Sequence, residues 1–227
     1  MILFRQKESD ERMPQVFHPS MNTFARVSIF GAAFLVAAIF GAGWSLVRSP
    51  YMTEAGVIRS QPVPFSHLHH VGEVGLDCRY CHQSVETEAF AGIPSTEVCM
   101  NCHSQLWSES EMLKPVLESF RTNKPLEWTR VHDSPDYVFF HHGIHVSKGI
   151  ACERCHGQVD QMPLMWRQNT LHMEWCLECH RHPEKHVRPK GDVFAMGWKP
   201  NEKTPTGAEL VAAHHIRSET NCSVCHR

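Results

Sequence analysis

Five C-x-x-C-H units constrain this chain more than any other feature of its sequence. They take up all ten cysteines and five of the eighteen histidines. The units are Cys78-Cys81-His82, Cys99-Cys102-His103, Cys152-Cys155-His156, Cys176-Cys179-His180 and Cys222-Cys225-His226. No cysteine is left over, so one chemistry has to account for every thiol in the chain.

This spacing is the attachment signature of c-type haem, in which two thiols add to the porphyrin vinyl groups and the following histidine binds the iron. Structural zinc usually takes two C-x-x-C pairs for each ion, and five pairs cannot be divided that way. Disulfides and thioredoxin-like pairs need no histidine after them. We therefore predict five covalently bound haem c groups, with ten thioether cysteines and five proximal histidines.

An uncharged stretch of 21 residues, VSIFGAAFLVAAIFGAGWSLV, lies between Arg26 and Arg48. It is long enough to cross a hydrocarbon core of about 30 Å as a helix. A cleaved secretory signal is the alternative, but the apolar run is longer than a typical signal core and no clear A-x-A site closes it. We expect an uncleaved single-pass anchor over 27–47 in the cytoplasmic (inner) membrane.

The basic residues around this stretch predict its orientation. Four precede it and two follow it closely: Arg5, Lys7, Arg12 and Arg26, then Arg48 and Arg59. By the positive-inside rule, residues 1–26 should stay cytoplasmic and the cysteine-bearing part should be periplasmic. Residues 48–64 are then a linker, and 65–227 form the pentahaem domain.

The motifs are organised in an internal repeat. Phe65-Ser66-His67-Leu68-His69-His70 precedes the first pair of motifs, and Phe140-His141-His142-Gly143-Ile144-His145 precedes the second pair. The module is F-x-H-x-x-H followed by two attachment motifs, over 65–103 and again over 140–180, with a fifth motif added at the C-terminal end.

This module predicts distal ligands for four irons. On one helical turn, residues i and i+3 point to nearly the same side but are separated along the axis, so one turn can serve two irons. We expect His67 and His142 to bind the irons attached just after them, and His70 and His145 to reach neighbouring irons. His69 and His141 fall off the pattern.

The fifth distal ligand stays open. The candidates are His132, Met173 and His186, with Met162 and the His214-His215 pair behind them. A methionine ligand would raise the potential of its iron above those of bis-histidine neighbours.

The predicted fold is a class III-like multihaem cytochrome c. It has one N-terminal transmembrane helix, then short helices and irregular coil wrapped round five haems, with almost no sheet. A helix is expected within 104–131, kinked or starting late because of Pro115. The formal charge of -2 points to no nucleic-acid partner, and ten propionates would make the loaded protein more acidic still.

The surplus of histidines favours saturated irons and therefore electron transfer, because substrate turnover at a haem needs an open coordination site. No Ser-His-Asp, paired-carboxylate or phosphate-loop pattern suggests other chemistry. We expect a membrane-tethered electron carrier with no catalytic site of its own.

The modules are similar to those of small class III multihaem cytochromes. The anchor together with FSHLHHVGEVGLDCRYCH, AFAGIPSTEVCMNCH, WTRVHDSPDYVFFHHGIH, MEWCLECHR and TNCSVCHR resembles the pentahaem cytochrome subunit of alternative complex III over nearly the whole chain. That resemblance implies a quinol-oxidising complex with an iron-sulfur subunit, polytopic quinol-binding subunits and another cytochrome c. Electrons would leave to a periplasmic carrier or an oxidase.

Two other functions remain open at this point. A NapC/NrfH-like quinol dehydrogenase also has a single anchor, but its first haem generally follows the anchor closely, whereas 29 residues separate Arg48 from Cys78 here. A haem enzyme that converts nitrite or hydroxylamine would need one five-coordinate, high-spin iron.

Overall fold

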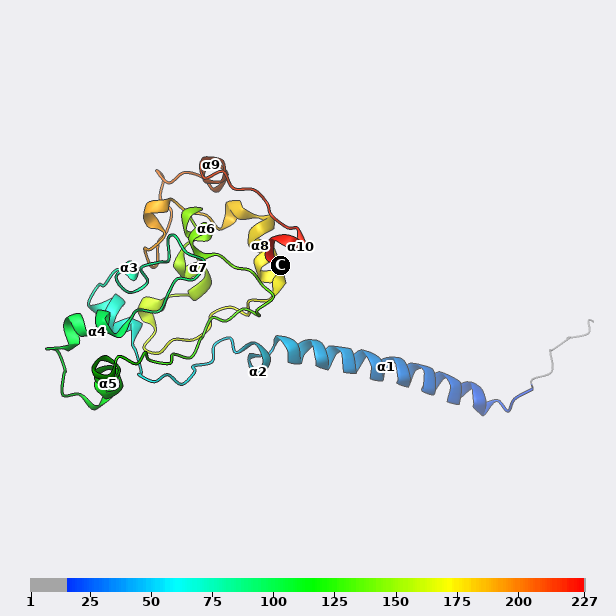
Figure 1. The fold of residues 1–227 in the computed structure, drawn as a ribbon. Coiled ribbons are helices and arrows are strands. Elements are labelled where there is room, and N and C mark those ends of the chain that lie inside the picture. Colours follow the sequence, from blue (N-terminus) through cyan, green and yellow to red (C-terminus); the bar gives the residue numbers. More distant parts are fainter. Residues whose placement is uncertain (1–15, 227) are drawn as a thin grey trace, which may run out of the picture. The chain divides into compact units, whose positions relative to one another are not determined.

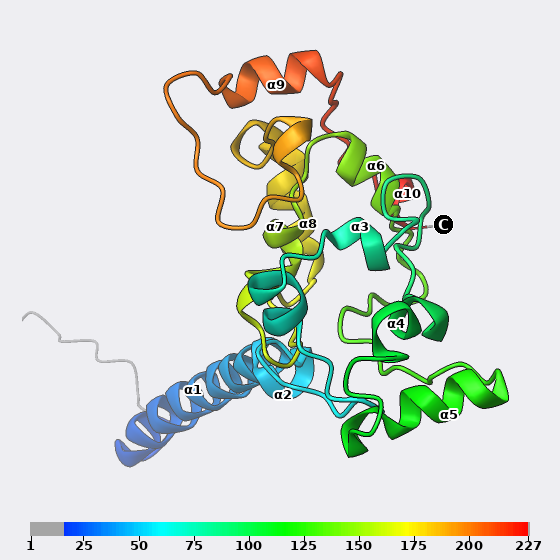
Figure 2. The ribbon, with the colours of Figure 1, turned by 90° about the vertical axis from the view of Figure 1, so that its left-hand side faces the viewer.

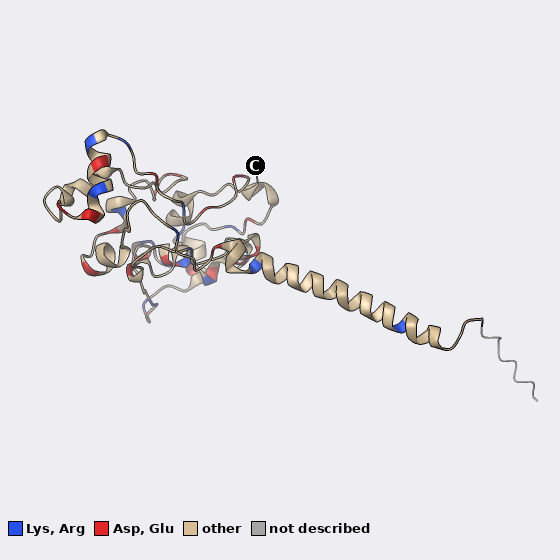
Figure 3. Ribbon diagram, turned by 90° about the horizontal axis from the view of Figure 1, so that it is seen from below, with Lys and Arg blue, Asp and Glu red and all other residues tan. Residues whose placement is uncertain are grey.

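The computed structural model describes residues 16–226 and divides the chain into two units, Met1–Arg48 and Ser49–Arg227. The described part of the first unit is dominated by helix α1, Ser20–Arg48. At 29 residues this helix is about 44 Å long, enough to span a bilayer. Its two basic residues, Arg26 and Arg48, lie towards its ends (Figure 3), it contains no acidic residue, and none of its residues is buried by the protein. The expected segment 27–47 falls inside α1, whereas most of 1–26 lies outside the described residues.

The second unit is built from short helices joined by irregular coil (Figures 1 and 2). No strand occurs within 16–226, where pairing is limited to isolated bridges such as Val138 with His226. This confirms the expected mixture of helix and coil without sheet. The elements are α2 Pro50–Thr53, η1 Leu68–Glu73, α3 Cys78–Cys81, α4 Thr96–His103, η2 Glu111–Leu113, α5 Lys114–Thr122, α6 His142–Ser147, α7 Cys152–His156, η3 Val159–Gln161, α8 Met173–Arg181, η4 Pro183–Lys185, η5 Lys190–Asp192, α9 Gly207–Ala213 and α10 Cys222–Cys225.

The apolar core of this unit is small. Its buried hydrophobic side chains are Val63, Val85, Val116, Ala151, Val159, Met162, Val193 and Leu210. None of them is aromatic, and valine predominates. A unit of this length normally buries a much larger apolar core. A large apolar group that fills the interior would supply the missing contacts.

Helix α5 begins where the proline allows it to begin. Pro115 occupies the first turn of Lys114–Thr122, where its missing N–H costs nothing, and Asn123 ends the helix in the left-handed conformation (φ 52°). The helix therefore starts late, with the proline in its first turn. Its Ser119 hydroxyl lies 2.7 Å from the Thr96 hydroxyl and so joins α5 to α4.

Buried arginines hold the coil segments in place. The Arg167 guanidinium donates to the carbonyl oxygens of Val131 (2.8 Å) and Thr53 (2.9 Å), two segments far apart in the sequence. Such bonds replace the sheet that the fold lacks, because they satisfy backbone acceptors in the interior. In Figures 1 and 2, α5 and α9 lie towards opposite ends of this unit, with α7 between them.

Candidate functional site

The cysteines of all five motifs lie on short helices. These are α3, the C-terminal turn of α4, α7, the second half of α8, and α10. In a helix, residues i and i+3 share a face, so each pair of thiols points the same way. All ten thiols are free and none forms a disulfide. Each pair is therefore available to bond one group.

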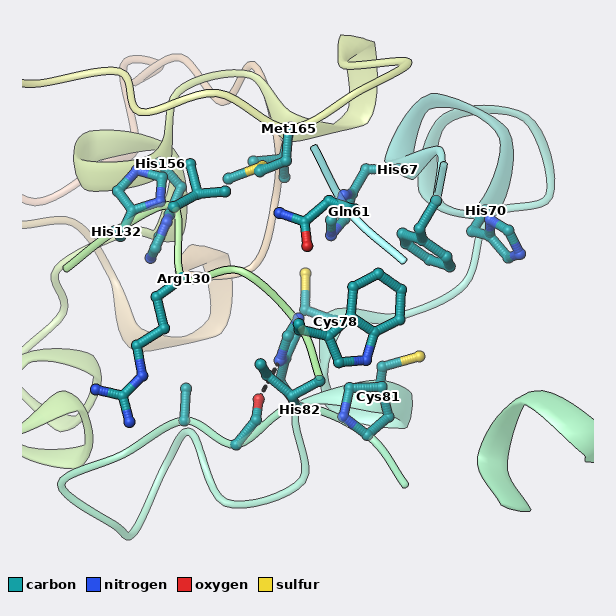
Figure 4. Close-up of a pocket in the computed structure, with 18 of the residues that line it drawn as sticks. Gln61, His67, His70, Cys78, Cys81, His82, Arg130, His132, His156 and Met165 are labelled. Atoms are coloured by element: carbon teal, nitrogen blue, oxygen red, sulfur yellow. Dashed lines mark hydrogen bonds between the residues drawn. The ribbon is translucent and has the colours of Figure 1, made fainter. Parts of the chain in front are cut away.

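A cavity of about 1650 Å³ lies among these motifs. Its lining includes all of the cysteines and histidines of the first three motifs, together with Cys176 of the fourth. Figure 4 shows His67, Cys78, His82 and His156 around this space. The small core, the large cavity and the free thiols at its wall together fit covalently attached porphyrins.

The two histidine-bearing segments have nearly the same geometry. Phe65 stacks on His70 with ring centroids 4.3 Å apart, and Phe140 stacks on His145 at 4.5 Å. The same phenylalanines meet His67 and His142 edge-on, at 4.9 and 4.7 Å. The first segment forms the π-helical turn η1 and the second forms α6, so the repeat preserves the ring positions across two kinds of helix.

Three histidine pairs are spaced to hold an iron between them. Two imidazoles that bind one iron from opposite sides have centroids about 6 Å apart, because each nitrogen lies about 2 Å from the metal and about 1 Å from its ring centre. His70 and His103 are 6.2 Å apart, and His145 and His180 are 6.1 Å apart. His142 and His156 are 6.3 Å apart.

Three of the four predicted distal histidines are also oriented by the backbone. Nδ1 of His70 lies 2.8 Å from the Ser66 carbonyl oxygen, and Nδ1 of His145 lies 2.8 Å from the carbonyl oxygen of His141. Nδ1 of His142 lies 3.2 Å from the Ala89 carbonyl oxygen. With Nδ1 protonated and bonded in this way, Nε2 is the atom left to bind a metal.

Burial disfavours the charged form of these imidazoles. It is the largest cause that lowers the pKa values of His70, His142 and His145. Burial, with His82 nearby, lowers the pKa of His67 to about 4. A histidine must be unprotonated to bind a metal, so these environments favour ligation.

His67 and His132 are two further candidate ligands, and both lie in the centre of the unit. Nδ1 of His67 and Nε2 of His132 are buried without a hydrogen-bond partner. His67 has the same place in the repeat as His142, and His82 is the first motif's counterpart of His156. His132 contacts the ring of His156 at 4.2 Å, too close for an iron between those two rings. The centre thus holds a third candidate histidine beyond His67 and His142.

The other candidates for the fifth distal ligand are scattered. Met173 is 65% exposed, and His186 Nε2 lies 2.9 Å from a Glu178 carboxylate oxygen. Met162 is fully buried, and Nδ1 of His214 lies 3.1 Å from the Lys148 carbonyl oxygen. Within the described residues, Tyr137 stacks on His226, the fifth proximal histidine, with ring centroids 5.8 Å apart.

Two contacts between motifs were not predicted from the sequence. Asn101 Nδ2 donates to the Tyr80 hydroxyl at 3.0 Å, and Arg154 Nη2 donates to a Glu178 carboxylate oxygen at 3.3 Å. All four residues are the third residue of their motif. The polar or charged side chain at this position of the first four motifs could have suggested such contacts from the sequence.

Helix-and-coil architecture, paired histidines and thiol-lined interior define a multihaem c-type cytochrome, an electron-transfer protein. The chain is 37% identical over 179 residues to the menaquinone reductase multihaem cytochrome c subunit of Nitratidesulfovibrio vulgaris Hildenborough. The alignment covers 70% of this chain and 82% of that protein. No protein-family model matches the chain. The chain belongs to this family of multihaem cytochrome c subunits, and its cofactor is covalently bound haem c.

Proposed function

We propose that the chain carries electrons through five c-type haems within a quinone-linked membrane complex. The attached haems supply one-electron redox chemistry. The ten thiols would hold these haems, the motif histidines would each bind one iron, and His67, His70, His142 and His145 would be the second protein ligands of four irons. The fifth opposite ligand is one of His132, Met173 and His186.

The histidine pairing is the observation that supports this role most strongly. Three pairs have centroids 6.1–6.3 Å apart, and the distal rings are oriented by backbone carbonyls. An iron bound on both sides cannot bind a substrate, but it changes oxidation state with little rearrangement. Such sites suit electron transfer and not turnover.

The membrane helix and the relative suggest the setting. The N. vulgaris protein is named as a subunit of menaquinone reductase. We infer a similar quinone-linked assembly here, in the arrangement of alternative complex III. Its partners would be an iron-sulfur subunit, polytopic quinol-binding subunits, another cytochrome c and a periplasmic electron acceptor. Residues 1–26 would be cytoplasmic, 27–47 would span the membrane, 48–64 would link, and 65–227 would be periplasmic.

The test is an electron paramagnetic resonance spectrum of the oxidised full-length protein, with pyridine haemochrome quantitation of haem per chain. Five haems, all low-spin, are expected. Fewer than five would refute the motif count, and five with one high-spin iron would favour an enzyme. In the intact complex, quinol should reduce these haems in a reaction that the purified chain alone does not perform.

A second cavity gives specific support to the alternative, a quinol dehydrogenase of the NapC/NrfH type. It has a volume of about 470 Å³, and Met52, Asp133, Asp136, Arg167 and His172 contribute to its wall. Met52 follows α1 by four residues, and carboxylates and a histidine could accept the protons of a quinol.

This alternative predicts that the purified chain oxidises a menaquinol analogue. The reaction should slow in a His172→Ala variant and not in a His182→Ala variant, since His182 does not line this cavity. If the purified chain has no such activity while the whole complex does, the quinol site lies on another subunit.

A further inference from the structure

In each of the two repeated modules, the histidine-bearing segment is hydrogen-bonded to the other module. The Leu68 amide donates to the Met162 carbonyl oxygen at 3.0 Å, and the Gly143 amide donates to the Glu88 carbonyl oxygen at 3.0 Å. Leu68 and Gly143 each lie three residues after the module's phenylalanine, and Met162 and Glu88 each lie ten residues after its first cysteine. The two bonds are therefore the same bond made in both directions.

This reciprocity is that of an isologous interface, in which residue i contacts j while j contacts i. Gly143 has to be small there, because a Cβ would lie 2.8–2.9 Å from backbone atoms of Glu86 and Thr87. Gly72, which is not the repeat counterpart of Gly143, lies against the backbone of Asp160. Glu86 and Asp160 are equivalent positions, so the histidine-bearing segment of each module packs against the same part of the other module.

Residues near a twofold axis meet their own equivalents. The side chains of Cys78 and Cys152 are neighbours at the wall of the same cavity, and each is the first cysteine of its module. The pseudo-twofold axis therefore passes between the first and the third motif. These two motifs are neighbours although the second motif separates them in the sequence.

The second motif of each module lies outward from this axis. Tyr80 of the first motif bonds Asn101 of the second, and Arg154 of the third bonds Glu178 of the fourth. Tyr80 and Arg154 are equivalent in the repeat, as are Asn101 and Glu178. The same contact is thus built twice, once on each side of the axis.

The fifth motif lies next to the fourth motif. The Ser218 hydroxyl donates to the carbonyl oxygen of His180, the proximal histidine of the fourth motif, at 2.7 Å. Further along, the Phe139 amide donates to the Cys225 carbonyl oxygen at 2.6 Å. The C-terminal segment therefore passes the fourth motif before it reaches its own attachment site.

We propose that the five attachment motifs form a row in the spatial order second, first, third, fourth, fifth. The ends of the row are the motif of Cys99 and Cys102 and the motif of Cys222 and Cys225, where electrons enter and leave the chain. The first and third motifs form its interior. This inference rests on the proposed function, in which all five motifs carry haem.

The direct test locates the irons of the loaded full-length protein by anomalous scattering at the iron edge, with the chain traced through the motifs. The iron at His82 should have the irons at His103 and His156 as its two nearest neighbours. The order is overturned if the iron at His103 lies closer than the iron at His82 to the iron at His156. Fewer than five irons would instead refute the proposed count.

A solution test uses two double variants, Cys78→Ala/Cys81→Ala and Cys99→Ala/Cys102→Ala. Each variant lacks both thiols of one motif and should therefore lose one haem. Neighbouring low-spin irons broaden each other's paramagnetic resonance lines. Loss of the interior first haem should sharpen the lines of two remaining haems, and loss of the terminal second haem should sharpen those of one. Sequence order would give the reverse. Haemochrome quantitation of four haems in each variant confirms that only the intended group is lost.

Discussion

Glu153 and Arg188 form a buried ion pair that ties the third motif to the segment after α8. Arg188 is 5% exposed, and its Nη2 donates to Glu153 Oε1 at 2.8 Å while its Nη1 donates to the Ala195 carbonyl oxygen at 3.0 Å. The other carboxylate oxygen accepts from Gln158 Nε2 and from the Gly197 amide, both at 2.7 Å. Three donors from separate segments therefore converge on one carboxylate.

A Glu153→Gln substitution keeps the shape of this site and removes its charge. The amide leaves one of the three donors without an acceptor and leaves the Arg188 guanidinium buried without a counter-ion. Breaking a buried pair from one side costs about 3–5 kcal/mol, and the lower end applies because the Glu153 side chain is 18% exposed. For a unit of this size, about 3 kcal/mol corresponds to a fall in Tm of roughly 6–12 °C.

The assay is thermal unfolding of the loaded protein, followed by circular dichroism. Glu118→Gln is the matched control, because it breaks an ion pair with Arg121 that is exposed on both sides and should leave Tm nearly unchanged. The double variant Glu153→Gln/Arg188→Met should be more stable than Glu153→Gln alone, since it removes the unpaired charge. Equal Tm values for the Glu153 and Glu118 variants would refute the reasoning.

Three further predictions concern a ligand, a close approach and the membrane helix. His70→Ala should convert about one iron in five to high spin by paramagnetic resonance, while His69→Ala, whose Nδ1 bonds Glu73 instead, should leave all irons low-spin; high-spin iron in both would contradict the assignment. Gly143→Ala should lower the free energy of unfolding of the loaded protein by about 1–3 kcal/mol in denaturant titration, because the new Cβ meets backbone atoms. Gly191→Ala is the control, since its Cβ meets no atom within 4 Å. Equal effects of the two substitutions would argue against the close contact between the modules. The full-length chain should stay in the membrane pellet after an alkaline carbonate wash, and its release would show that α1 does not span the bilayer.

Local patterns were enough to predict the chemistry of this chain. Each C-x-x-C-H unit contains its own attachment geometry within five residues, so haem c followed without knowledge of the fold. The F-x-H-x-x-H segments likewise contain their own ring stacking, and the pairs of His70 with His103 and His145 with His180 fit the expectation that these histidines reach neighbouring motifs. The predicted individual ligands and the count of five stay predictions.

Long-range packing could not be predicted in the same way. Nothing in the sequence near Leu68 indicates that its amide bonds Met162, because that contact depends on how two modules fit together. His132 is another example, since its place against His156 depends on the coil between the modules. For α5, the sequence allowed a kink or a late start, and the preference of proline for the first helical turn decided for the late start.

The twin contacts of Tyr80 with Asn101 and of Arg154 with Glu178 have an evolutionary consequence. In a dimer of one ancestral module, both contacts would come from one gene and would have to be identical. Joining the two copies in one polypeptide frees each contact to change alone, and here one pair is neutral while the other is charged. The two halves of this unit therefore differ in charge at equivalent contacts, although the repeat gives them the same framework.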